Sequence, residues 1–176
     1  MRDGNRISEI SEIKRNVIKA LYSNPDIIEM LDNPDIDPDC PDTAEFTAIF
    51  PYIKVPGTQE DQSCYIGVKI SIPEYRYLTN DVFVDALLTI AVICHVGKMK
   101  VPGQKGTRVD IICGDIAEML NYSRDFGSFT MHLKADVEDN YYENNNYYTR
   151  TQKYAIKVSN NTDNGRKRFR SMKSSF

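Results

Sequence analysis

Residues 82–96, VFVDALLTIAVICHV, alternate between two kinds of side chain, and the fold class follows from them. Every second residue is apolar, and these residues would share one face: Val82, Val84, Ala86, Leu88, Ile90, Val92, Cys94 and Val96. A period of two is typical of a half-buried β-strand, because successive side chains point to opposite faces of a sheet. The run therefore predicts a long strand with one face on the core.

Three further strands and one extended segment are predicted around this run. Residues 64–72, 129–137 and 147–158 alternate in the same way. Residues 44–57 are apolar but are interrupted by two prolines, which favours an extended segment or an edge strand.

Two helical regions are also predicted. Residues 8–31 place apolar side chains three and four apart, with a break at Asn24-Pro25. Asn is a good N-cap and Pro a good first helical residue, so a short helix should follow the break. Thr107 begins the second region, and Asp110 three residues later completes a pair resembling a capping box.

The predicted element order is helix, extended segment, two strands, helix and two strands. This order favours an α+β fold, an antiparallel sheet of about four strands with two helices packed on one face. A length of 176 residues fits one domain, predicted over residues 1–158, with residues 159–176 as a flexible basic tail.

Charge is distributed unevenly along the chain. The net charge is -3, yet the last eleven residues, RKRFRSMKSSF, hold five basic residues and no acidic one. The preceding 165 residues carry 17 basic and 25 acidic residues, a balance of -8. An acidic body with a basic tail points to binding through complementary charge.

The sequence predicts neither a membrane span nor secretion. Its longest apolar stretch, residues 87–96, has ten residues, whereas a spanning helix needs about 20. The N-terminal residues MRDGNRISEI contain no apolar signal core. We therefore expect the protein to work where it is made or to be released by lysis.

The four cysteines, Cys40, Cys64, Cys94 and Cys113, are widely spaced and form no CxxC pair. Reduced, mostly buried thiols are favoured over a disulfide framework. Cys94 is next to His95, but adjacent strand residues face opposite ways and cannot easily share zinc. We expect neither His95 nor His132 to bind a metal.

No constellation in the sequence predicts catalysis. Asp35, Asp37 and Asp39 have the spacing of the first calcium ligands of an EF-hand, but Cys40 and Phe46 stand where Gly and Glu are required. A solvated acidic loop, open to a basic partner surface, is favoured instead. The chain also lacks a GxSxG elbow and the glycine-rich phosphate loops, so we expect no enzyme activity and no cofactor.

The basic tail permits three interpretations. Its Arg and Lys residues around Phe169 are suited to nucleic-acid phosphates, or they form a passive solubilising terminus. A third possibility is an arm that docks on an acidic neighbouring subunit. We expect this segment to be disordered in the free subunit and to become ordered on assembly.

Several segments resemble the tail terminator, or tail completion, proteins of long-tailed bacteriophages. The resemblance covers roughly residues 7–158 and departs at the acidic loop 32–42 and the basic extension 159–176. It lies in pattern and order rather than in a catalytic motif. The segments that carry it are RNVIKALYSNPDIIEML, FPYIKVPGT, DALLTIAVICHV, TRVDIICGDIAEML and FTMHLKADV.

The resemblance implies a structural virion protein that forms a ring, commonly a hexamer, at the head-proximal end of the tail tube. Such a ring stops tube polymerisation and docks to the head connector. The implied partners are further copies of the chain, the tail tube protein, neck proteins and DNA passing through the lumen, and no membrane. The implied location is the tail or neck of a virion that is assembled in the host cytoplasm.

Other functions remain open from the sequence. They are a head-side connector or stopper of the neck, a small DNA-binding module that uses the basic tail, and an unrecognised enzyme. We expect self-association through strand edges at residues 64–75 or 147–158. The candidate partner or inter-subunit residues are Arg166, Lys167, Arg168, Phe169, Arg170, Ile156, Tyr154, Asp35, Asp37 and Asp39.

Overall fold

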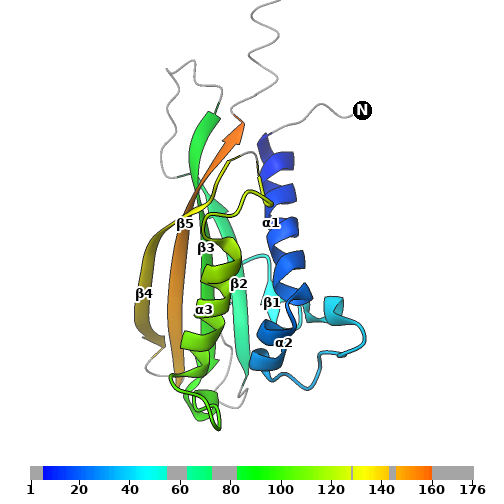
Figure 1. The fold of residues 1–176 in the computed structure, drawn as a ribbon, viewed down its shortest axis with the longest axis vertical. Helices are drawn as coiled ribbons and strands as arrows, with labels where there is room; N and C mark the ends of the chain where they lie inside the picture. The colour runs from blue at the N-terminus through cyan, green and yellow to red at the C-terminus, as the bar shows by residue number, and fades with distance from the viewer. Residues whose placement is uncertain (1–5, 55–62, 73–82, 128, 143–145, 160–176) are drawn as a thin grey trace, which may run out of the picture.

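A five-stranded sheet with helices on one face organises the protein (Figure 1). The structure is a computed structural model that describes residues 6–54, 63–72, 83–127, 129–142 and 146–159. The strands, in sheet order, are β1 (Ile49–Phe50), β2 (Cys64–Ser71), β3 (Phe83–His95), β5 (Tyr147–Ser159) and β4 (His132–Tyr142). The basic segment 166–170 lies outside the described residues.

The α+β class is confirmed, but the expected four-stranded antiparallel sheet is wrong in two details. The sheet has five strands, and it is mixed because β1 runs parallel to β2 through Ile49–Ile66 and Phe50–Gly67. The four longer strands pair antiparallel, as expected. Pro51 directly follows β1, and it limits the strand to two residues because proline has no N–H for a ladder.

Three α-helices cover one face of the sheet. They are α1 (Arg6–Ser23), α2 (Pro25–Leu31) and α3 (Arg108–Leu120), and short 3₁₀ turns occupy Pro41–Ala44 and Val96–Lys98. In Figure 1, α1 and α3 lie in front of the sheet, and α1 begins at the same end at which β5 ends. The Asn24-Pro25 break divides the predicted first helical region into α1 and α2, which explains the third helix.

The main core lies between these helices and the sheet. The even-numbered residues of β3 contact the buried faces of α1 and α3, including Val17, Leu21, Ile112 and Ile116. A smaller cluster on the opposite face contains Phe50, Tyr65, Ala91, Ile93 and Tyr147.

Gly67 allows the chain after β1 to cross this second face at close range. A Cβ atom on Gly67 would lie 2.8 Å from the Tyr52 carbonyl oxygen and 2.9 Å from Ile53 Cα. Lys54 Nζ lies 4.0 Å from the Tyr65 ring centroid, so a cation–π contact completes the cover over the small cluster.

The cysteine prediction is partly wrong. Cys64 and Cys94 are direct partners in the β2–β3 register, with Cα atoms 4.1 Å apart, and form a disulfide. Cys113 is buried and free, and Cys40 is free and exposed. The 30-residue spacing of Cys64 and Cys94 did not indicate the bond, because only the register of two strands places them opposite each other.

The predicted free strand edges are wrong for residues 147–158 and only partly wrong for residues 64–75. β5 lies between β3 and β4 and is an interior strand. β2 lies between β1 and β3, but within the described residues β1 pairs only with Ile66 and Gly67 of β2. The edge strands among the described residues are β1 and β4. Within β5, Tyr154 is fully buried and Ile156 is 5% exposed, so both side chains pack in the core of one subunit and offer little surface to a second.

Candidate functional site

A groove lies between α2 and the following acidic loop. Local backbone chemistry shapes it. The Asn24 side chain accepts hydrogen bonds from the backbone N–H groups of Asp26 and Ile27, which starts α2. Asp32 then ends the helix in a left-handed conformation, with φ 47°, and turns the chain away.

The acidic loop is held by turns made from its own side chains. Asn33 Oδ1 accepts from the N–H of Asp35 at 2.9 Å, and Asp37 Oδ1 accepts from the N–H of Asp39 at the same distance. Thr43 Oγ1 accepts from Asp37 N–H. These Asx turns account for part of the repeated Asn, Asp and Pro pattern through local hydrogen bonds.

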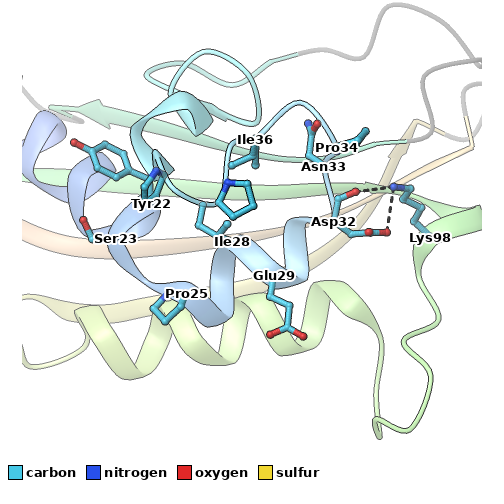
Figure 2. A pocket seen from close by; sticks show the side chains of 12 residues that line it. Tyr22, Ser23, Pro25, Ile28, Glu29, Asp32, Asn33, Pro34, Ile36 and Lys98 are labelled. Carbon is cyan, nitrogen blue, oxygen red and sulfur yellow. Dashed lines mark hydrogen bonds and ion pairs between the residues drawn. The ribbon is translucent and has the colours of Figure 1, made fainter.

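The groove has a volume of about 680 Å³, within the range of ordinary ligand sites. Its lining is largely apolar: Tyr22, Pro25, Ile28, Pro34, Ile36, Pro38 and Pro41. Figure 2 shows Tyr22 at one end and the Asp32–Lys98 pair at the other, with Ile28 and Ile36 between them. Pro34 and Pro38 lie in turns outside every helix and strand, and Pro25 and Pro41 each begin a helical segment.

The segment that surrounds the groove, called its rim below, is strongly acidic, and of its acidic residues Glu29 and Asp32 line the cavity itself. The segment 24–45 carries eight acidic residues and no basic one: Asp26, Glu29, Asp32, Asp35, Asp37, Asp39, Asp42 and Glu45. Lys98 Nζ lies 3.2 Å from Asp32 Oδ2, and Arg108 lies 3.5 Å from the same oxygen. Asp35, Asp37 and Asp39 are exposed and enter none of the ion pairs found in the described part.

A second charged cluster lies where α3 meets β4 and β5. The Arg150 guanidinium binds both carboxylate oxygens of Asp136, at 2.7 and 3.0 Å, and also contacts Asp110 and Glu138. Gln152 donates to the Cys113 carbonyl and to Asp136, and the buried Tyr154 hydroxyl donates to Gln152 at 2.7 Å. This network ties the helix to the sheet.

The protonation states of this cluster agree with a structural role. The hydrogen bond from the Thr107 hydroxyl lowers the pKa of Asp110, and Arg150 adds to the effect. Burial raises the pKa of the Cys113 thiol to about 12, so the thiol stays protonated and is a poor nucleophile at neutral pH.

The predicted metal candidates are not brought together. Cys94 packs in the main core, while His95 lies against Tyr147 on the other face, with ring centroids 5.3 Å apart. His95 is 6% exposed, so its ring is buried on that face, and the two adjacent side chains point to opposite faces as expected. Across the described ranges, no group of three or more His, Cys, Asp and Glu residues has a geometry that could hold a metal ion.

Sequence reasoning placed Asp35, Asp37 and Asp39 correctly in a solvated loop but missed the groove beside them. The signal was present in the prolines at positions 25, 34, 38 and 41, which were interpreted only as turn formers. None of the helices in the described part of the chain is both long and apolar enough to cross a membrane.

A comparison with family models finds a match to YomW over residues 15–156. The chain belongs to the YomW family. This family is phage-associated, which makes the protein a phage protein. The YomW match covers the second half of α1, all of α2, α3, β1, β2, β3 and β4, and β5 up to Ile156, and it stops before the basic segment. A comparison with curated proteins finds no match.

Proposed function

We propose that the protein is a tail terminator, which forms a ring at the head-proximal end of a phage tail tube. The ring stops tube polymerisation and provides a docking surface for the head connector. The phage-associated family supports this proposal, and so does the α+β architecture that the tail terminator resemblance implies.

The observation that carries the proposal is the sheet with two different edges. β4 pairs only with β5 within the described residues, so one side of an 11-residue strand is open. At the other edge, two-residue β1 covers only Ile66 and Gly67 of β2. Two unlike edges favour head-to-tail contacts between copies, and such contacts form a ring when the rotation between neighbouring copies closes on itself.

Apolar side chains beside the β4 edge add area to such a contact. Phe83 and Phe129 stack edge to face at 4.7 Å and are each 37% exposed. Val137, in β4, is 43% exposed and lies on the sheet face opposite the helices, across from Thr151. Exposed apolar groups close to an open strand are typical of a surface that is covered in an assembly.

The test is the size and shape of the purified chain, measured by light scattering after size exclusion and by negative-stain imaging. We expect a closed ring that binds the tail tube protein of the same phage. A ring that binds only portal-side neck proteins would make the chain a head-side connector, and a strictly monomeric chain would refute the proposal.

A matched pair of variants tests whether the interface between subunits lies at β4. Val137→Lys introduces a charge at the β4 edge and should weaken ring formation without unfolding an exposed position. Val96→Lys is the control, since Val96 is 52% exposed and lies outside the sheet edges. Equal assembly of the two variants would contradict the β4 interface.

A further inference from the structure

We propose that the acidic groove binds the basic C-terminal segment of its own chain, with Phe169 inserted between α2 and the loop. The proposal concerns an intramolecular contact and does not depend on ring formation or on a phage tail. It therefore replaces the expectation from the sequence that this segment becomes ordered only on assembly.

Charge complementarity selects this occupant. The groove segment 24–45 has eight acidic and no basic residues, while residues 166–176 have five basic and no acidic ones. Lys98 and Arg108 neutralise Asp32 at one end of the groove, which leaves the excess negative charge on the rim formed by the loop. The negative charges of segment 24–45 and the positive charges of residues 166–176 attract each other, which favours contact between the two segments.

The apolar lining selects Phe169 within that segment. Ile28 is half-buried and Pro25, Pro34 and Pro38 are exposed, so their apolar surface has contact with water. An aromatic ring that enters such a lining removes apolar surface from water, which favours binding. The flanking Arg168 and Arg170 would stay at the acidic rim. A nucleic-acid phosphate would be repelled by the same rim.

Chain length permits this contact within one molecule. β5 ends beside the start of α1, whereas the groove lies at the other end of α1 (Figure 1). The 18 residues of α1 span about 27 Å at 1.5 Å per residue. Ten residue steps join Ser159 to Phe169, and a fully extended chain of that length reaches about 33–36 Å.

The same reach disfavours the groove of a lateral neighbour. In a ring joined through sheet edges, every groove lies at the same end of its subunit. The tail would then have to cross the width of a subunit in addition to the length of α1. A tethered segment also has a high effective concentration at its own groove.

Photo-cross-linking in the full chain tests the proposal. p-Benzoylphenylalanine replaces Phe169, which keeps an aromatic ring, and an equal mixture of ¹⁴N- and ¹⁵N-labelled chains is irradiated at low salt. We expect cross-links to residues 22–41 that join peptides of one label only. Mixed-label cross-links would move the occupant to a second copy, and cross-links elsewhere, or none, would overturn the proposal.

Charge variants separate groove binding from general attraction. The triple substitution Asp35→Asn, Asp37→Asn and Asp39→Asn keeps the side-chain acceptors of the loop turns and should reduce the yield about tenfold. The control removes the same charge elsewhere, through Asp85→Asn, Glu118→Gln and Asp125→Asn, and should leave the yield unchanged. An equal loss in both variants would show that only net charge acts, which would contradict the groove.

Discussion

Carboxylates gather in two regions of the protein, and the two regions use them differently. Around Arg150, three carboxylates from α3 and β4 meet one guanidinium, and the contacts join a helix to two strands. In the loop 32–42, Asp35, Asp37 and Asp39 face solvent, and their hydrogen bonds stay within residues 33–43. The first set holds the fold together, while the second leaves its charge available to a partner.

The largest effect is expected where a carboxylate has neither a cation nor water. Ile116→Asp puts one on the fully buried face of α3 and should cost about 4 kcal/mol or more, enough to unfold a marginal domain. Gly114→Asp is the control, because a Cβ at this exposed helical position meets no atom within 4 Å. Denaturant unfolding measures both, and similar stability would place this face of α3 outside the core.

The second-largest loss of stability is expected when the cation of the Arg150 cluster is removed. Arg150→Met leaves Asp110, Asp136 and Glu138 close together without a counter-charge, at a cost of about 2–4 kcal/mol. Lys157→Met breaks an exposed pair with Asp85 and should cost less than about 0.5 kcal/mol. Comparable losses for the two variants in urea titrations would remove the distinction between the regions.

The dependence of stability on pH should reveal the contacts of Asp110 with Thr107 and Arg150. The folded pKa of Asp110 is lowered, so its bonds stabilise the protein above its unfolded pKa, near about 4. That stability is lost as pH falls through the folded pKa. We therefore expect Asp110→Asn to be less stable than wild type by about 1 kcal/mol at pH 7, with the gap closing below about pH 4. A gap that is constant with pH would contradict the assignment.

The smallest change in stability is expected in the solvent-exposed acidic loop, residues 32–42. The triple Asn variant of Asp35, Asp37 and Asp39 should change the unfolding free energy by less than about 0.5 kcal/mol, because exposed charges without ion pairs contribute little. Thermal unfolding checks this, with Arg150→Met as the sensitive reference. A loss above about 1 kcal/mol would show that the loop charges are structural.

Local features were predictable from the sequence because neighbouring residues produce them. Thr107 and Asp110 form the capping box that their spacing indicated, and Asn24 caps α2 as expected. The alternation of residues 82–96 gave a strand at Phe83–His95 with the expected core face.

Features that depend on strand register or tertiary contact were not predictable. Arg150 lies 14 residues from Asp136 and 40 from Asp110, and only the β4–β5 register and the packing of α3 bring them together. The parallel pairing of β1, the Cys64–Cys94 bond and the groove likewise depend on contacts between distant segments. Periodicity reports which face a residue takes and does not report what lies opposite it.

The start of α1 and the end of β5 lie at the same end of the sheet (Figure 1), so the described fold begins and ends in nearly the same place. A fold whose first helix starts close to the end of its last strand can be opened at another turn without changing its contacts. The turn at Gly103, exposed and with φ 78°, lies outside every helix and strand and is a natural place for such an opening. A circular permutant that joins β5 to α1 and begins at Gly103 would keep the same order of strands in the sheet. The ribosome would, however, make α3, β4 and β5 before α1, β1, β2 and β3.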